Sequence, residues 1–396
     1  MTLHNLTTDF QHWFRQLNRI EKAFMTLLLL GLFTYLLFFI VHASACLLYP
    51  YDLDNEEGFI LNQTVRLSHG QTIYPDLKSY PYTVGNYPPL HPLLGVPLTW
   101  IFGPVHLGGR LISILATLLL CGVAGRWVYR LTSGDWGAAL FTALFPFGIH
   151  YFYLWGVYNR VDMLGLALCF WGMYLFYRNP EKLLMPALLF TLALYAKQTL
   201  LAAPATVFIY SLIYYRRNAW RLPVYMLAMG LPVFGLLMVM THGEIYRHLV
   251  AYNINPYYVA DMINYLTNIQ KYYWPILVLA LTSFFLTWRQ PKEKVLLGIY
   301  TVLAFGVMLT AGKEGSAVNY LLEFMLLIVI LSGVCIGWIK NLNRVKYLIP
   351  LVVVILWSLV VQIHQGPFGG WKYLFETLCY LVSVFLSAGI LISLGW

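Results

Sequence analysis

The chain has 396 residues, of which 60% are hydrophobic and only 10% are charged, and its formal net charge is +9. A typical soluble domain is about 45–50% apolar, so this composition excludes an ordinary soluble protein and indicates one that uses lipid as part of its solvent. The basic excess does not require nucleic acid as a partner, because membrane topology explains where Lys and Arg lie. The five cysteines are widely spaced in or beside apolar runs, which fits neither a zinc site nor a disulfide framework.

Apolar runs between polar breaks predict an all-α polytopic membrane domain over residues 1–396, with about 12 transmembrane helices, in a range of about 11–13. No small-residue cleavage site precedes the first run, so we expect an uncleaved first helix in the inner or plasma membrane. The predicted spans are 23–49, 107–131, 135–157, 161–178, 183–196, 198–215, 221–240, 273–288, 294–311, 319–339, 347–364 and 373–395.

The segment 88–104, PPLHPLLGVPLTWIFGP, is apolar but rich in Pro and Gly, which favours an interfacial or re-entrant segment over a span. If it stays on the outer side, most Lys and Arg residues fall in inner segments, as the positive-inside rule requires. If it crossed, every later loop would invert. Both termini, including residues 1–22, are therefore predicted to be cytoplasmic, with residues 50–106 and 241–272 as large outer loops.

An acidic cluster follows the first predicted span, in the stretch YPYDLDNEEGF. Asp54 and Glu57 have the spacing of an N-cap and its N3 partner, which predicts a capping box and a helix that runs to about His69. Asp52 fits a solvated loop position. Glu56 is the carboxylate that local structure does not require.

Other outer breaks carry charge at helix ends or inside apolar runs. Charge at membrane depth costs about 2.5–3.5 kcal/mol on insertion scales, so it usually lines a cavity or finds a partner. Simpler alternatives are an interfacial Arg160–Asp162 pair, a snorkelling Lys197 and a solvated turn at Lys313. Asn319 and Glu323 are spaced i and i+4, hence on one helical face. The candidate polar and charged residues in and beside these breaks are Arg160 and Asp162 in VYNRVDM, Lys197 in YAKQT, and Lys313, Asn319, Tyr320 and Glu323 in GKEGSAVNYLLE.

The order of these features resembles that of the GT-C integral-membrane glycosyltransferases, which include protein O-mannosyltransferases and lipid A aminoarabinose transferases. The matching elements are EEGFILNQTVRLSHGQTIYPDL, GNYPPLHPLL, GRLISILATLL, YNRVDMLGLALCFWGMY, LYAKQTLL and GSAVNYLLE, within about residues 23–330. Glu56 and Glu57 stand where the better-known members have an Asp-Glu pair.

The resemblance implies a GT-C fold with interfacial helices in the first outer loop. It also implies an inverting transfer of a sugar from a polyprenyl-phosphate donor to a lipid, glycan or protein acceptor, on the extracytoplasmic face. The implied catalytic base is Asp54, Glu56 or Glu57, and the implied phosphate ligands are Arg160, Lys197 and Lys313. The remaining candidates for substrate binding are Tyr87 of the YPPL turn, Asp162, Asn319, Tyr320 and Glu323.

A divalent cation, Mg²⁺ or Mn²⁺, is a further option, because hard cations prefer the oxygen ligands that Asp54, Glu57 and Asp162 offer. Several family members act without metal, so metal dependence stays open.

Two other classes of function remain. A secondary transporter or lipid flippase would also have intramembrane charge, but should show paired broken helices or related halves, and we detect none. An O-antigen-ligase-like transferase would use a diphosphate donor and basic residues in a late loop, where this chain has His242, Arg247 and His248.

Overall fold

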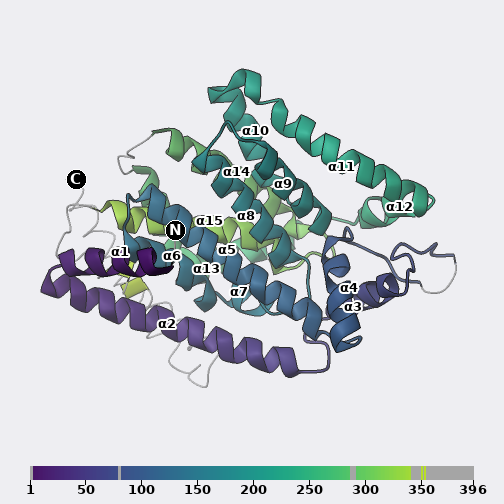
Figure 1. Ribbon diagram of the computed structural model, residues 1–396, viewed down its shortest axis with the longest axis horizontal. Helices are drawn as coiled ribbons and strands as arrows, with labels where there is room; N and C mark the ends of the chain where they lie inside the picture. Colours follow the sequence, from purple (N-terminus) through teal and green to yellow (C-terminus); the bar gives the residue numbers. More distant parts are fainter. Residues whose placement is uncertain (1–2, 79–81, 286–290, 340–348, 351, 354–396) are drawn as a thin grey trace.

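The computed structural model of the protein describes residues 3–78, 82–285, 291–339, 349–350 and 352–353. Over these residues the chain is a bundle of helices without a β-strand (Figure 1). The α-helices are α1 (Leu3–Gln16), α2 (Arg19–Leu48), α3 (Glu57–Ser68), α4 (Leu90–Phe102), α5 (Leu107–Leu131), α6 (Trp136–Leu144), α7 (His150–Trp155), α8 (Asp162–Arg178), α9 (Leu184–Ala196), α10 (Ala202–Tyr214), α11 (Arg221–Met240), α12 (Glu244–Leu249), α13 (Val259–Phe285), α14 (Pro291–Met308) and α15 (Leu322–Trp338).

The prediction of an integral membrane protein is confirmed. Within the described residues, five helical segments are long and apolar enough to cross a membrane: 19–48, 107–131, 221–240, 291–312 and 318–338. Each coincides with a predicted span, and the shorter apolar helices α9 and α10 coincide with two more. The last two predicted spans, 347–364 and 373–395, fall almost entirely outside the described residues, so the total of about twelve stays a prediction.

Helix α15 forms the centre of the bundle. Every residue from Leu322 to Ile336 is buried, mainly against α13, α14 and α6. A helix that is apolar on all sides is stable only when it is enclosed by other helices or by lipid. Gly333 allows α6 to approach, because a Cβ at this position would lie 2.0 Å from Thr142 Oγ1.

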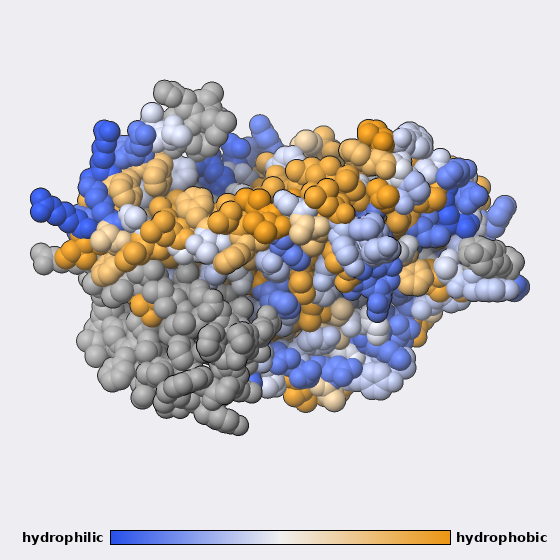
Figure 2. All heavy atoms as spheres, turned by 90° about the horizontal axis from the view of Figure 1, so that it is seen from below, coloured by the Kyte–Doolittle hydropathy of each residue, from blue (hydrophilic) through white to orange (hydrophobic). Residues whose placement is uncertain are grey.

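Helices α2 and α11 are instead the lipid-facing elements. Large apolar side chains on α2, such as Leu30, Leu37 and Phe38, are exposed, and α11 has Leu222 as its one buried residue. Seen from below, hydrophobic side chains form a lengthwise band, with hydrophilic side chains at both of its ends and beneath its middle (Figure 2). Such a band is expected where hydrocarbon replaces water as the solvent.

The prediction of one helix over 135–157 is wrong, because the segment is broken. Helix α6 ends at Leu144, a 3₁₀ turn covers Phe145–Gly148, and α7 begins at His150. Pro146 lacks the N–H that a continuing α-helix needs, so the ladder of backbone hydrogen bonds stops there.

The predicted helix 273–288 begins fourteen residues earlier than expected, at Val259 in α13. Hydropathy marks only the lipid-embedded part of a helix, whereas the polar first half of α13 still forms backbone hydrogen bonds. At about 1.5 Å per residue, its 27 residues exceed the roughly 30 Å hydrocarbon core, so α13 projects beyond it. The predicted outer loop 241–272 is therefore largely helical.

Helices α3 and α4 pack on each other within the predicted first outer loop. The 13 residues of α4 span about 20 Å, which is too short to cross a hydrocarbon core of roughly 30 Å. Helix α3 ends at Ser68, and Gly70 follows with φ +68°, close to the predicted end. These two helices and α12 lie at one end of the bundle, and α1 lies at the other (Figure 1).

The close approach at Gly333 makes a stability prediction. Gly333→Ala should lower the free energy of unfolding by about 1–3 kcal/mol, because the added methyl group overpacks the contact with Thr142. The matched control is Gly122→Ala in α5, where no atom lies within 4 Å of the added Cβ. Thermal unfolding in detergent should separate the two variants, and equal stabilities would contradict this account of α15 packing.

Candidate active site

Arg110, in the first turn of α5, organises the loop that carries the acidic cluster. Its side chain is fully buried. Nη1 donates to the carbonyl oxygens of Cys46 (2.6 Å) and Tyr49 (2.5 Å), and Nη2 donates to that of Tyr51 (2.7 Å). Arg110 thus binds carbonyl groups in the last turn of α2 and in the segment that follows it.

The same guanidinium forms a buried ion pair with Glu57. Nε donates to Oε1 (2.9 Å) and Nη2 donates to Oε2 (2.7 Å), and both side chains are 0% exposed. The backbone N–H groups of Leu53 (2.7 Å) and Asn159 (2.6 Å) also donate to this carboxylate. The Glu57 carboxylate therefore connects the acidic loop, α5 and the segment before α8.

The contacts of Glu57 overturn its predicted capping role. Helix α3 begins at Glu57 itself, after an N-cap residue, Glu56, that makes no side-chain cap. Burial would raise the pKa of Glu57, but the bonds from Arg110 and the two backbone N–H groups outweigh it and hold the pKa below its ordinary value. A buried cation is a stronger partner than the N–H groups of a helix end, so the side chain turns inward. With four donors on its two oxygens, Glu57 is a poor candidate for the base.

A second cluster surrounds Arg160, immediately after Asn159. Arg160 Nη1 donates to Asp54 Oδ2 (2.5 Å), Nε donates to Asp162 Oδ2 (3.2 Å), and Nη2 donates to the Tyr87 hydroxyl (3.3 Å). Burial would lower the pKa of Arg160, but the charge of Asp162 and the groups around it raise it, so the guanidinium stays charged. Asp54 is therefore an ion-pair partner and not the predicted helix cap.

Asp162, at the start of α8, extends this cluster into the bundle. Its Oδ1 accepts from Lys197 Nζ (2.6 Å) and from Asn319 Nδ2 (2.8 Å). The Lys197 ammonium lies 4.6 Å from the centre of the Tyr320 ring, a cation–π contact. Residues predicted from three separate sequence motifs thus meet around one carboxylate.

Glu323 lies behind this cluster, in the first turn of α15. It lines a small cavity with Asp162, Lys197, Asn319 and Tyr320. Its Oε1 accepts from the Tyr300 hydroxyl (2.8 Å), whereas Oε2 is buried with no hydrogen-bond partner among the described residues.

Glu56 differs from its acidic neighbours in having no cation to hold it. It is half-buried, and the hydrogen bonds and ion pairs of the described residues include none to its carboxylate. Its backbone N–H donates to Asp54 Oδ2 (3.3 Å), which places the Asp54 carboxylate beside the backbone of Glu56. Burial raises the pKa of Glu56, the charge of Arg160 opposes this, and the charges of Asp162 and Asp54 add to the rise.

Asp52 is not merely solvated, which corrects another expectation. Its Oδ1 lies 2.7 Å from Nε2 of His106, a buried residue just before α5. Burial lowers the pKa of His106.

Sequence reasoning missed both His106 and Arg110. The available signal for Arg110 was a lone cation in the first turn of an apolar helix, a position where charge needs a partner.

The donor atoms of Asp54, Glu57 and Asp162 do not fit the divalent cation that the sequence left as an option. Asp54 and Asp162 pair with Arg160, while Glu57 pairs with Arg110, so the three carboxylates share no site. In the described part of the chain, the one group of three potential ligands with atoms within 4.8 Å of each other is Asp52, Glu57 and His106. The guanidinium of Arg110 already neutralises Glu57 there, and its charge would repel a metal ion.

Lys313 lies apart from the cluster. The segment around it pairs with residues 256–258: the N–H of Tyr258 donates to the Gly312 carbonyl (2.7 Å), and the N–H of Glu314 donates to the Pro256 carbonyl (2.9 Å). These bonds give the segment a structural role, because they join the turn before α13 to the turn after α14.

Two of the three residues named for the late loop, Arg247 and His248, have structural partners. The Gly85 N–H donates to His248 Nδ1 (2.8 Å), and His248 Nε2 lies 2.7 Å from the Pro75 carbonyl oxygen. Arg247 pairs with Glu244 (2.6 Å). His248 thereby fastens the late loop to the first outer loop, which weakens the ligase-like reading.

Comparison with known proteins identifies the fold. No protein-family model matches the chain, and no curated protein matches it significantly. Two solved structures of ArnT from Cupriavidus metallidurans do match, both with a TM-score of 0.63 and 16% sequence identity. The chain has the ArnT fold.

The match to ArnT in the apo state covers 83% of this chain and 64% of that chain. The match to ArnT bound to undecaprenyl phosphate covers 91% of this chain and 72% of that chain. This chain thus spans less than two thirds of the apo ArnT chain. ArnT has a GT-C fold, so the expected GT-C fold is confirmed.

The Glu57–Arg110 pair predicts a large loss of stability when one partner is removed. Glu57→Leu should lower the free energy of unfolding by about 3–5 kcal/mol, because it leaves a buried guanidinium unpaired. The control is Arg247→Ala, which breaks a part-buried pair whose arginine is 54% exposed, and which should therefore cost less than Glu57→Leu. Chemical or thermal unfolding in detergent measures both.

The pH dependence gives a second check on the same pair. Because the folded-state pKa of Glu57 lies below its unfolded value, its contribution is present above the unfolded pKa of about 4.3 and is lost as pH falls through the folded pKa. The gap between wild type and Glu57→Leu should therefore persist from neutral pH to about pH 5. A gap that closes in this window would contradict the ion pair.

Proposed function

We propose that the chain is an inverting glycosyltransferase that moves a sugar from a polyprenyl-phosphate donor to an acceptor hydroxyl or amine, outside the cytoplasm. The observation that carries the proposal is Glu56, an unpaired carboxylate beside the cations Arg160 and Lys197. The ArnT fold supports it, because one ArnT structure contains undecaprenyl phosphate.

In this proposal Glu56 is the general base. It accepts the proton of the acceptor as the acceptor's oxygen or nitrogen bonds to the anomeric carbon. The bond between that carbon and the phosphate oxygen breaks, and its electron pair leaves with the polyprenyl phosphate. Attack from the opposite face inverts the anomeric centre.

Arg160 and Lys197 are proposed to bind the donor phosphate. The bonds to Asp54 and Tyr87 use one N–H on each terminal nitrogen of Arg160, and the bond to Asp162 uses one of three on Lys197. The remaining N–H groups are available to phosphate oxygens. Donors fixed before the reaction stabilise charge that develops on a leaving group at little reorganisation cost.

The charges of the cluster suit this sequence of events. Three carboxylates, Asp54, Glu56 and Asp162, face two cations, so the formal charge is −1 before reaction. Protonation of Glu56 neutralises it while the phosphate gains a negative charge. One negative charge thus moves from the base to the leaving group, and the total charge of the protein cluster and its substrates is unchanged.

Asp54 is the rival base, and its ion pair argues for a positioning role. Its carboxylate is held by Arg160 at 2.5 Å, so taking a proton would break that bond. Glu56 has no such bond to lose. In the predicted orientation, with cytoplasmic termini, both residues lie on the outer side of the membrane.

Glu56→Gln should reduce kcat by about 10²–10⁴-fold, the usual contribution of a general base, while leaving donor binding nearly unchanged. The assay supplies purified protein with labelled polyprenyl-phosphate sugars and a panel of acceptors. Asp54→Asn is the matched variant, and should weaken donor binding as well because it releases Arg160. Retained turnover in Glu56→Gln would move the base elsewhere.

The pH profile tests the same assignment. A base must be ionised, so kcat should fall as pH decreases through the pKa of Glu56, at a pH above the ordinary glutamate value of about 4.3. Glu56→Gln should lose this limb of the profile.

Lys197→Ala and Arg160→Gln should each weaken binding of polyprenyl phosphate, because each removes a charge from the proposed phosphate site. Isothermal or fluorescence binding measurements at two salt concentrations would report it. Lys313→Ala is the control, since Lys313 lies outside the cluster. Unchanged affinity in the first two variants, with solute uptake in vesicles, would favour a transporter.

A further inference from the structure

The turn between α8 and α9 borders a hollow that has no part in the proposed reaction. The hollow lies where this turn meets the first turns of α11, and its empty volume is about 1120 Å³, including space open to the surroundings. The polar residues of its lining are Arg178, Asn179, Glu181 and Lys182, and the rest of the lining is apolar apart from Tyr225. We call it the α8–α9 hollow.

Helix α8 separates this hollow from the candidate active site by about the thickness of a membrane. The helix begins at Asp162, in the site, and ends at Arg178, in the hollow. At about 1.5 Å per residue, its 17 residues span about 25 Å, close to the roughly 30 Å of a hydrocarbon core. With the site on the outer side, as predicted, the hollow lies at the level of the inner headgroups.

The cations of the hollow have no partner in the described part of the protein. The hydrogen bonds and ion pairs there include none to the side chain of Arg178 or Lys182, and both side chains are exposed. Glu181 is the one acidic residue of the lining, so two cations face one carboxylate. Arg221, exposed one helical turn before Tyr225 on α11, adds positive charge nearby. The hollow therefore suits an anionic group.

The apolar side of the hollow continues onto the lipid-facing surface. Leu184 and Met185, in the first turn of α9, are 59% and 57% exposed. Tyr225 lies on the lipid-facing helix α11, between the exposed residues Val224 and Leu227. A ligand that fits both sides of the hollow has an anionic head and a hydrocarbon tail.

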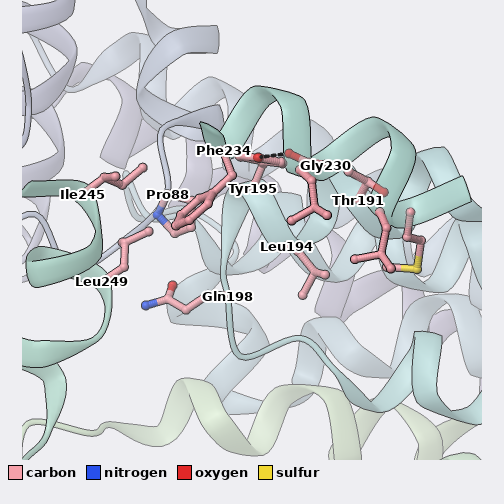
Figure 3. A pocket seen from close by; sticks show the side chains of 12 residues that line it. Pro88, Thr191, Leu194, Tyr195, Gln198, Gly230, Phe234, Ile245 and Leu249 are labelled. Carbon is pink, nitrogen blue, oxygen red and sulfur yellow. Dashed lines mark hydrogen bonds between the residues drawn. The ribbon is translucent and has the colours of Figure 1, made fainter. Parts of the chain in front are cut away.

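The two helices that border the hollow are held together further along. The Tyr195 hydroxyl on α9 donates to the Gly230 carbonyl on α11 at 2.8 Å (Figure 3). A second hollow surrounds this bond, but none of the described side chains that line it is charged, as Leu194 and Phe234 illustrate (Figure 3). Of the two hollows, only the one at the start of α9 offers a cation to a phosphate group.

We propose that the α8–α9 hollow binds the headgroup of an anionic phospholipid of the surrounding membrane. Arg178 and Lys182 bind the phosphate group, and the acyl chains lie along the exposed first turn of α9 and along α11. Basic pockets between helices at a membrane surface bind such headgroups. A free phosphate ion would leave the apolar walls without a partner, so the lipid is the better fit. The site is separate from the proposed chemistry and does not depend on it.

Lipid binding to the full chain in detergent tests the proposal, with native mass spectrometry as the measurement. Phosphatidylglycerol is the anionic probe and phosphatidylcholine is the zwitterionic one. Phosphatidylglycerol should bind about fivefold more tightly or better, because it carries a net negative charge to the cations of the hollow. Inorganic phosphate at the same concentration should not displace it. Equal affinities for the two lipids, or displacement by inorganic phosphate, would overturn the proposal.

The double variant Arg178→Gln, Lys182→Gln should lower the affinity for phosphatidylglycerol about tenfold or more, because it removes both phosphate ligands. The matched control is Arg15→Gln, Arg19→Gln, which removes two exposed charges of the predicted cytoplasmic segment outside the hollow. The control should change the affinity less than about twofold. An equal loss in the two double variants would show attraction to general surface charge and no site.

Met185→Glu tests the apolar wall without weakening the fold. An acidic residue in the first turn of α9 complements the positive end of the helix dipole, whereas its charge repels a phosphate in the hollow. We expect the affinity for phosphatidylglycerol to fall about fivefold or more, with a melting temperature in lipid-free detergent no lower than that of wild type. An unchanged affinity in a folded variant would contradict the placement of the lipid against α9.

Discussion

The site depends on the cost of holding charge away from water. Arg110 and Glu57 have no solvent access, and either charge alone would be strongly destabilising. Together they bind the end of α2, the acidic loop and the segment that leads to Arg160. The pair thus holds the backbone on both sides of Asp54 and Glu56 and next to Arg160, although neither of its residues has a direct part in the proposed chemistry.

The division between the two adjacent glutamates follows from the same constraint. Glu57 is held by Arg110, has a lowered pKa and has no free oxygen. Glu56 is half-buried, with a raised pKa and no ion pair among the described residues. One pair of like residues thus supplies an anchor and, in the proposed mechanism, the base, because their surroundings differ.

Much of the fold was predictable because apolar runs report directly on lipid-embedded helices, as in α2, α5 and α15. The gathering of Asp54, Arg160, Asp162, Lys197 and Asn319 was anticipated only as a set of outer charges, since pairing depends on tertiary contacts. The predicted capping box at Asp54 is absent for that reason. The Asp54 side chain pairs with Arg160, which lies more than a hundred residues away in the sequence, and does not cap the helix. The break at Pro146 and the early start of α13 were not predicted, because hydropathy averaged over a window of residues does not show where a helix breaks or where its polar part begins.

The Arg110–Glu57 contact also constrains how the chain is threaded through the membrane. Glu57 precedes α4 and Arg110 follows it, yet their side chains touch. Two residues in contact lie at the same depth, so the intervening segment must enter and leave on one face and cannot make a single crossing. A chain that inserted α4 as a span would strand the two charges on opposite sides of the bilayer. A chain inserted in that way would lose the ion pair and leave both charges unpaired, so the pair stabilises only the arrangement in which α4 does not cross.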